Sequence, residues 1–556
     1  MFKKSSFSKI PMIKKSSGLI SFEIDSQATD KVTTNFSNSL QFWISWLGYA
    51  VGYGNIWRFP YMVYKNGGGV FFIPYVIWIV VIWLPLFYLE ISYGQIYRRE
   101  VHRYYDKIHP RLLGLSFNVS IIIFFIAVYT NWLIAWWFTF FLYSFQDPLP
   151  WAPETGVINK DSFISNHYFV DVFLNRSEGG LFNITSYSTT IMFSFLIVTL
   201  ITFFTIYRGI ETSKYVVYVT VPLPYILMTI LFVKGITLEG NSIGWIYLFK
   251  PEWSKLFTLQ IWSDAAGQVL FSAGLAHNTI VKFASHRNEN DSLLVSTLMI
   301  PLMNFATSIF AAITLFSFIG YASFKTGIPI KEMPVYGMEL TFVIYPALLN
   351  ILPFPQIWSA MFFLMLTWLG LGTIYVLIET ISSLVYGTWN RRASFGRSKR
   401  FVTFSIWALI LWINLLLFAS STGYYWLEIV DHYATSVNLV VSLFFQLVVI
   451  IYLLPITELA QKVSYFGETF PKVYLFPLRY LCPVFSLVLA GVAILNEFRN
   501  PKMSEYFLDQ LVSICIFITP TVVMLVVAFW NPFGVDEEKE KEERELRLRD
   551  MFSDSE

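Results

Sequence analysis

The sequence predicts an all-α membrane protein with twelve transmembrane helices. We expect two five-helix inverted repeats, in which the first and sixth helices are broken, plus two peripheral helices. Of the 556 residues, 55% are hydrophobic and 14% are charged, a balance that water-soluble domains of this size do not have. Apolar runs long enough to cross about 30 Å of hydrocarbon recur along the chain. Two of these runs carry glycines and polar residues where a continuous membrane helix would have neither.

Hydropathy places the twelve spans, and they divide the chain into three parts. We expect an N-terminal tail at 1–38, a twelve-helix membrane domain at 39–533 and a C-terminal tail at 534–556. The expected spans are 40–62, 70–96, 115–144, 189–207, 214–233, 261–283, 294–321, 356–386, 401–420, 427–454, 473–495 and 508–531.

The distribution of charge predicts how the chain is oriented. Arg and Lys are concentrated in the linkers 97–111 and 387–400, which the positive-inside rule places in the cytoplasm. The connection 145–188 has five acids and two bases, and its sequons at Asn175 and Asn183 suit a glycosylated extracellular loop. An even number of spans then puts both termini in the cytoplasm. We expect a multi-pass protein of the plasma membrane.

The first expected span contains the strongest signal of a binding site. Gly48, Gly52 and Gly54 interrupt it within the segment 47–75. Backbone groups without a partner in hydrocarbon cost several kcal/mol each, so a break here requires a solvated or ion-filled site. A broken helix offers its freed carbonyls to a cation and its amide end to an anion, which is typical of secondary transporters.

The sixth expected span shows a second interruption. Gly267 and the step Gly274–Ala276 are flanked by Ser272 and Asn278. Two broken helices five spans apart indicate repeats of inverted topology with a site between them. The alternative is that these glycines only allow neighbouring helices to pack closely.

Several motifs resemble one known family. They are GNIWRFPY (54–61), KNGGGVFFIPY (65–75), LPLFYLEISYGQ (84–95), YTNWLIAW (129–136), KGITLEG (234–240), WSDAAGQVLFSAGL (262–275), FFLMLTWLGLGT (362–373) and IVDHYA (429–434). In this order and spacing they are similar to the neurotransmitter:sodium symporters, also called solute carrier family six. The resemblance is to an atypical member of the amino-acid and GABA branch.

The resemblance implies two sodium sites. The first would use oxygen atoms of Ala50, Asn55, Ser272 and Asn304, all hard donors that suit an alkali cation. A lone membrane Asn such as Asn304 could instead make an interhelical hydrogen bond. The second site would use Gly48, Val51, Leu369 and Thr373.

The resemblance also implies a chloride site formed by Tyr75, Gln268, Ser272 and Ser308. All four side chains can donate a hydrogen bond to an anion. The alternative is that these hydroxyls bond backbone carbonyls, as Ser often does inside membrane helices.

A substrate pocket and an outer gate follow from the same resemblance. Arg58 and Asp431 would form the gate, because a guanidinium at membrane depth needs a carboxylate or water. Relatives that carry amines place an aspartate at Gly52, so a glycine there favours an amino acid or a similar zwitterion. The pocket is expected to involve Gly52, Tyr53, Gly54, Val128, Thr130, Phe271, Ala273, Gly274 and Ala276.

The chain also departs from the family pattern. Thr130 replaces the tyrosine that caps the pocket in relatives, with Tyr129 expected on another helical face. Gly372 supplies no side-chain oxygen where relatives place Asp or Thr in the second sodium site. The inner-gate positions carry Thr33, Phe36, His286 and Gly387, and the pair of cysteines in the outer loop is absent.

Further intramembrane acids, Glu90 and Glu379, are read as polar ties between helices, without a transport role.

Two functions therefore compete. The first is a symporter that couples Na⁺ and Cl⁻ to uptake of an amino-acid-like solute by alternating access. The second is a non-concentrating relative that acts as an ion-leak channel, a solute sensor or a trafficking partner. No organic cofactor, enzyme activity or nucleic-acid partner is expected, since the motifs for these are missing. The expected partners are the solute and the lipid bilayer. A second copy of the chain, in a homo-oligomer, is an alternative partner.

Overall fold

The computed structural model describes most of the membrane domain. The described residues are 39–98, 105, 110–152, 167–177, 179–206, 218, 220–275, 277–287, 291–333, 340–390, 399–453, 456–465, 468–499 and 506–530. Within these ranges the regular structure is helical, and the sole β-type pairing is an isolated bridge between Tyr187 and Ser420.

The described residues of the first half of the chain form α-helices and shorter helical elements. In chain order they are α1 (Ser39–Ala50), η1 (Gly54–Arg58), α2 (Phe59–Lys65), η2 (Gly68–Phe71), α3 (Phe72–Trp78), η3 (Ile79–Trp83), α4 (Leu84–Tyr97), η4 (Pro110–Leu112), α6 (Leu113–Tyr143), η5 (His167–Phe173), α8 (Thr189–Ile206), α10 (Pro222–Ile236) and α11 (Asn241–Phe249).

The second half continues in the same way. Its elements are η6 (Trp253–Phe257), α12 (Leu259–Ala273), α13 (Thr279–Ser285), α14 (Leu293–Thr326), η7 (Ile330–Glu332), η8 (Leu340–Ile344), α15 (Tyr345–Asn350), α16 (Pro355–Asn390), α17 (Lys399–Ile413), η9 (Asn414–Phe418), α18 (Gly423–Asp431), η10 (His432–Asn438), α19 (Leu439–Val448), η11 (Val449–Leu453), α20 (Ile456–Tyr465), α21 (Lys472–Phe476), η12 (Pro477–Leu481), α22 (Cys482–Arg499) and α23 (Phe507–Trp530).

Nine helical stretches in the described part of the chain are long and apolar enough to cross a membrane. They coincide with nine of the expected spans: Gly68–Tyr97, Leu113–Tyr143, Thr189–Ile206, Leu293–Thr326, Pro355–Gly387, Lys399–Phe418, Gly423–Tyr452, Lys472–Leu495 and Phe507–Trp530.

The other three expected spans are interrupted or bent. Residues 40–62 and 261–283 are each split into helices too short to cross a bilayer alone. The span expected at 214–233 corresponds to α10, which meets the following helical stretch at 109° and makes a tenth span if the bent pair counts as one. The full set of twelve stays a prediction.

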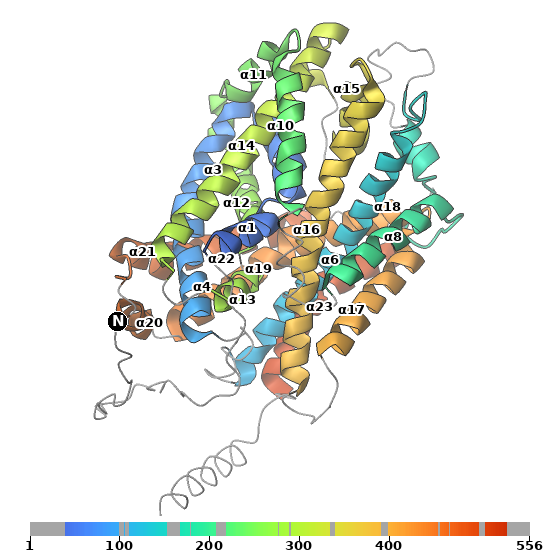
Figure 1. Cartoon of the computed structure of the whole chain (residues 1–556). Helices are drawn as coiled ribbons and strands as arrows, with labels where there is room; N and C mark the ends of the chain where they lie inside the picture. Colours follow the sequence, from blue (N-terminus) through green and yellow to red (C-terminus); the bar gives the residue numbers. More distant parts are fainter. Residues whose placement is uncertain are drawn as a thin grey trace, which may run out of the picture.

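The helices pack in two groups (Figure 1). In the first, α13 and α14 pack on α4, α12 packs on α3, and α14 also contacts α1. We call α1, α2, α3, α4, α12, α13 and α14 the broken-helix group. In the second, α6 packs along α16 and α8, and α17 packs on α16 and α8. We call α6, α8, α16 and α17 the scaffold group.

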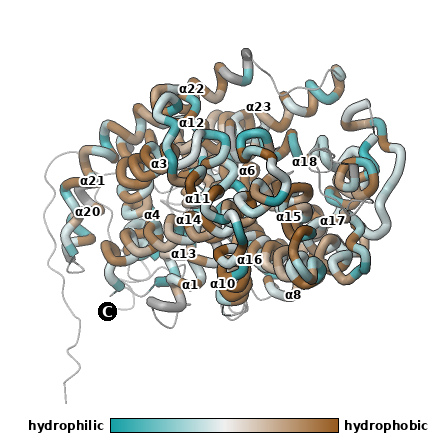
Figure 2. Tube along the Cα trace, turned by 90° about the horizontal axis from the view of Figure 1, so that it is seen from above, coloured by the Kyte–Doolittle hydropathy of each residue, from teal (hydrophilic) through white to brown (hydrophobic). Residues whose placement is uncertain are grey.

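Burial separates central from peripheral helices. Of the most apolar 18-residue stretch, 78% is buried in Leu113–Tyr143 but only 22% in Phe507–Trp530. The exposed side chains of α23 are apolar, among them Phe507, Leu511 and Phe529. Seen from above, hydrophobic residues cover the outer as well as the inner helices (Figure 2). An apolar outer surface of this kind is stable in lipid and not in water.

Polar bonds hold the loop between α6 and α8 to the helix ends. Both carboxylate oxygens of Asp509, in the first turn of α23, accept from the backbone N–H of Leu181 at 3.1 and 3.2 Å. Tyr425 of α18 donates to the carbonyl of Ser177 at 3.1 Å. These bonds fix the loop without the disulfide that its sequence lacks.

One glycine sets the distance between α4 and α13. A Cβ at Gly94 would lie 2.4 Å from the carbonyl oxygen of Val281 and 2.5 Å from the Cβ of Ala284. Because real Cβ atoms do not approach this closely, any larger residue must push the two helices apart. A Cβ added at Gly267, by contrast, would have no atom within 4 Å.

We therefore expect Gly94→Ala to destabilise the protein by about 1–3 kcal/mol, the usual cost of overpacking. Gly267→Ala is the matched control and should be neutral or stabilising by up to about 1 kcal/mol, since alanine favours a helix. Thermal unfolding of the detergent-solubilised chain measures both. Equal melting temperatures for the two variants would refute the close contact.

Candidate functional site

The first expected span is broken in the middle. Helix α1 ends at Ala50, and a turn of π-helix, η1, begins at Gly54. The backbone between them is bridged by a bond from the N–H of Asn55 to the carbonyl of Gly52 at 3.2 Å. The expectation that Gly48 forms part of the break is wrong, because this residue lies inside α1, where a glycine costs little enough to be tolerated.

The second break separates α12 from α13. Gly274 ends α12 in the left-handed region with φ of +58°, which glycine adopts without strain. Asn278 shares this φ just before α13 begins. Gly267 was expected to contribute but lies within α12. Ala276 lies outside the described residues.

The two breaks are adjacent in space. Helix α12 contacts both η1 and α2, and Figure 1 shows α1 and α12 near the middle of the molecule. The ring of Phe271 packs on Gly54, where an added Cβ would lie 2.8 Å from the ring. A larger residue at position 54 would have to displace the Phe271 ring.

A cluster of polar side chains joins the breaks to α14. The amide nitrogen of Asn55 donates to the side-chain oxygen of Asn304 and to Ser308 Oγ, the latter at 2.7 Å. Ser272 Oγ donates to the same Asn304 oxygen at 3.1 Å. All four side chains are buried. We call them the polar cluster.

The polar cluster contains three of the four residues assigned to the first sodium site. The fourth, Ala50, is buried at the end of α1, where the last carbonyls of a helix lack partners within it. An amide can present either its nitrogen or its oxygen toward a neighbour. Asn55, Ser272 and Asn304 can therefore turn oxygen atoms toward one cation, so the residues fit such a site.

Of the residues assigned to chloride, Ser272 and Ser308 belong to the polar cluster, and Tyr75 and Gln268 lie beside it. The hydroxyl of Tyr75, fully buried, is directed at Ser272 and Ser308 but makes no hydrogen bond of normal geometry. Gln268 donates to the carbonyl of Gly54 at 3.2 Å, and its side-chain oxygen has no partner. A buried hydroxyl without a hydrogen-bond acceptor costs free energy, unless a bound group accepts a hydrogen bond from it. This donor set fits a bound anion.

The residues assigned to the substrate pocket meet across η1 and α6. The hydroxyl of Tyr53 lies 3.1 Å from Thr130 Oγ1 and donates to the hydroxyl of Tyr129 at 3.3 Å. Tyr129 precedes Thr130 by one residue on α6 and was expected on another helical face, yet the long side chain of Tyr53 reaches both hydroxyls. Val128 of α6 and Ala273 of α12 are also buried.

The second sodium site is only partly assembled. An added Cβ at Gly372 would lie 3.0 Å from the carbonyl oxygen of Gly48, so α16 passes directly beside the end of α1. Thr373 Oγ1 donates to the carbonyl of Leu369 within α16 at 3.3 Å. Val51 is buried just after α1 ends. Gly372 itself offers no side-chain oxygen at this point.

The expected outer gate is not joined in this structure. The guanidinium of Arg58 lies 4.5 Å above the ring of Phe271, an arrangement that stabilises a cation. Asp431 accepts from Thr435 Oγ1 at 3.4 Å, and no ion pair links it to Arg58. Both charges nevertheless act electrostatically on Tyr53, which places them near the same aromatic residue.

At the end of the structure that carries the expected inner-gate positions, Glu379, which the sequence analysis read as a polar tie between helices, pairs with two lysines that the sequence analysis did not single out. Lys282 of α13 and Glu379 of α16 form an ion pair with 3.2 Å between Nζ and Oε1, and Lys399 of α17 lies 2.7 Å from the same oxygen. A lysine within an expected span was a signal that could have identified this site. The two other inner positions, His286 and Gly387, are buried; Thr33 and Phe36 lie outside the described residues.

A second buried cation, Arg287, stabilises the structure at the end of α13. Arg287 lies between α13 and α14, donates to Ser296 Oγ at 2.9 Å and stacks 4.6 Å above the ring of Phe42. Burial lowers the pKa of Arg287 to about 10, while Asp291 and Glu468 oppose this shift. The group therefore stays charged at neutral pH. It ties the end of α13 to α1 and α14.

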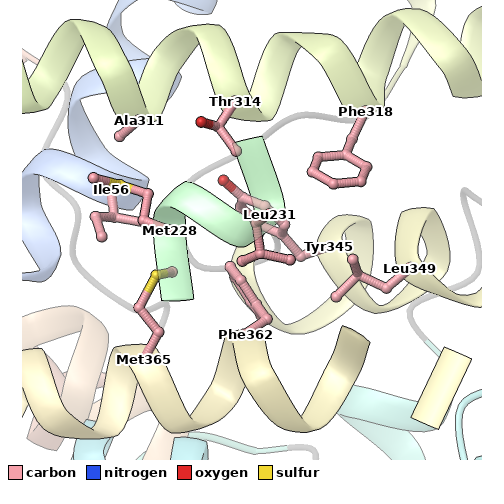
Figure 3. Close-up of a pocket in the computed structure, with 10 residues that line it drawn as sticks. All are labelled: Ile56, Met228, Leu231, Ala311, Thr314, Phe318, Tyr345, Leu349, Phe362 and Met365. Atoms are coloured by element: carbon pink, nitrogen blue, oxygen red, sulfur yellow. The ribbon is translucent and has the colours of Figure 1, made fainter. Parts of the chain in front are cut away.

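An apolar cavity lies beside the breaks (Figure 3). Its volume of about 10 Å³ is room for about one water molecule. None of the residues assigned to the substrate pocket lines it. The lining residues are Ile56, Met228, Leu231, Ala311, Thr314, Phe318, Tyr345, Leu349, Phe362 and Met365. The cavity is too small and too apolar to be the expected solute site.

The sequon residues Asn175 and Asn183 are both exposed. Asn175 donates to Ser186 Oγ at 2.9 Å. Their glycosylation stays a prediction.

Comparisons with known proteins identify a family and relatives of this chain. The model of the sodium:neurotransmitter symporter family matches residues 33–535. The chain is 32% identical to the creatine transporter of Torpedo marmorata, over 72% of this chain and 68% of the relative. It is 30% identical to the sodium- and chloride-dependent glycine transporter 1 of Xenopus laevis, over 75% and 72%. It is also 30% identical to the sodium-dependent dopamine transporter of Caenorhabditis elegans, over 79% and 77%.

These matches cover nearly the whole membrane domain and confirm the resemblance found in the motifs. The relatives are transporters and not enzymes. The chain is an integral membrane transporter, and it belongs to the sodium:neurotransmitter symporter family.

Proposed function

We propose that the protein is a sodium- and chloride-dependent symporter of an amino acid or a related small zwitterion, working by alternating access in the plasma membrane with both termini in the cytoplasm. The observation that carries the proposal is the polar cluster, in which Asn55 at one helix break and Ser272 at the other donate to the same oxygen of Asn304. Backbone and side-chain oxygens gathered at two breaks suit a desolvated cation better than any packing role.

The substrate class rests on Gly52. This residue lies in the first break and is buried, so no carboxylate is present there to pair with a substrate ammonium. Glycine and creatine, named in two relatives, each carry a carboxylate. A substrate carboxylate can approach the first sodium site through the space that Gly52 leaves.

Coupling to sodium supplies the driving force. Each sodium charge that moves down the membrane potential provides about 2.3 kcal/mol per 100 mV. The chain's own residues then have two tasks, to hold the ions beside the solute and to close one side before the other opens.

The non-concentrating alternative is favoured by one observation. Gly372 faces the Gly48 carbonyl without offering an oxygen, so the second sodium site has one ligand fewer. A transporter that couples fewer ions builds a smaller solute gradient.

Uptake into sealed vesicles tests the proposed function. We expect a panel of radiolabelled amino acids, with creatine and dopamine for comparison, to show at least one zwitterion accumulated when sodium and chloride gradients are present. Collapsing the sodium gradient should abolish the accumulation. Ion currents without accumulation of any solute would instead support the alternative.

The first sodium site is tested with Asn55→Ala. This change removes a side chain that contacts both Asn304 and Ser308, so sodium-dependent uptake should be lost at physiological sodium. Flux measured against sodium concentration, with surface expression as the control, is the readout. Normal sodium dependence in this variant would rule out the assignment.

The chloride site is tested most cleanly with Tyr75→Phe. The hydroxyl makes no hydrogen bond of normal geometry within the protein, so its removal should weaken chloride dependence roughly tenfold, the loss of one charge-assisted hydrogen bond, and leave sodium affinity nearly unchanged. Ser308→Ala is the comparison, since it also removes an acceptor from Asn55 and should alter both ions. If Tyr75→Phe keeps its chloride dependence, the site lies elsewhere.

The second sodium site is tested by restoring its missing oxygen. Gly372→Asp would place a carboxylate beside the Gly48 carbonyl and should lower the half-saturating sodium concentration roughly tenfold by adding a charged ligand. Gly372→Ala is the control for crowding, because its Cβ meets the same oxygen at 3.0 Å. Equal sodium dependence in the two variants would show that no ion binds there.

A further inference from the structure

The ion pair between Lys282 and Glu379 crosses from the broken-helix group to the scaffold group. Lys282 lies on α13, whereas Glu379 lies on α16. The exposed fractions of the two side chains are 7% and 9%. Charges this deep are expensive to bury, and they are usually retained for a specific contact.

Several bonds give this contact a defined geometry. Lys282 Nζ donates to the backbone carbonyl of Glu379 at 2.6 Å and to Ser383 Oγ at 2.5 Å, in addition to the ion pair. Residues 379 and 383 are one helical turn apart and share a face of α16. The ammonium is therefore held by three oxygen atoms of a single scaffold helix.

Other contacts attach α13 to its own group. The close approach at Gly94 fixes α13 against α4. Arg287, directly after α13, contacts Phe42 of α1 and Ser296 of α14. If the two groups separate at this end, α13 stays with α1, α4 and α14, and the contact from Lys282 to α16 has to break.

A third charged residue, Lys399, lowers the free energy needed to break the ion pair between Lys282 and Glu379. Lys399 remains 2.7 Å from Glu379 and belongs to α17 of the scaffold group. Glu379 would thus keep a partner when Lys282 leaves, so no carboxylate is stranded. Lys282 would then face the opening between the groups, where water can solvate it. This end adjoins the basic linker 387–400, which the positive-inside rule assigns to the cytoplasm.

We propose that Lys282 is an inner-gate residue, which closes the cytoplasmic side by pairing with Glu379 and opens it by releasing that carboxylate to Lys399. The inference rests on the proposed alternating-access function. It also accounts for the loss of the family's usual inner gate at His286 and Gly387, because a different pair bridges the same end of the molecule.

The test is hydrogen–deuterium exchange on the full-length chain in lipid nanodiscs. In Lys282→Gln, amides of α13 should exchange roughly tenfold faster, the change expected when one charge-assisted interaction is lost, while those of η1 and α2 stay the same or slow down. Glu379 keeps Lys399 in this variant, so the chain should fold. Lys282→Arg retains the charge and should behave as the wild type.

Lys65→Gln is the matched control. Lys65 of α2 pairs with Asp264 of α12 at 2.9 Å, so this ion pair joins two members of the broken-helix group and does not cross to the scaffold. Its loss should leave exchange in α13 unchanged. A role in general stability, rather than gating, would raise exchange in α13, η1 and α2 together when Lys282 is changed.

The gate proposal is overturned by that uniform increase, by unchanged exchange in Lys282→Gln, or by an arginine variant that exchanges as fast as the glutamine variant. These outcomes do not depend on solute transport. A wild-type chain that accumulates no solute would refute the proposed symport and leave the exchange result to decide the gate.

Discussion

The cost of unpaired backbone groups in hydrocarbon constrains this structure more than any other interaction. Two membrane helices are interrupted, after Ala50 and after Ala273, and the freed groups need partners that lipid cannot provide. The structure meets this need by placing both breaks side by side and lining them with Asn55, Ser272 and Asn304. The arrangement of the surrounding helices follows, because each must keep these side chains away from lipid.

The spans could largely be predicted from the sequence, because an apolar run of sufficient length has few stable forms in a bilayer. The positions of the breaks were harder. Gly48 and Gly267 belong to the same glycine-rich pattern as Gly52 and Gly274, yet both lie inside helices. A glycine permits a break but does not impose one, since the tertiary contacts decide where helical hydrogen bonding stops.

The candidate site, too, could be predicted from the sequence only in part. The grouping of Asn55 with Asn304 came from the family resemblance, since the two are 249 positions apart and local sequence carries no sign of their contact. The bond between Tyr53 and Tyr129 and the pairing of Lys282 with Glu379 were missed. Both depend on how far a long side chain reaches across an interface, which helical periodicity does not give.

The loop between α6 and α8 is fastened by Asp509, a residue of the last described helix, through two contacts to one amide. A non-covalent fastener of this kind is indifferent to the redox state of its compartment, unlike a cystine bridge. It also joins this loop to the last described helix. The contact at Leu181 can form only after synthesis has passed residue 509.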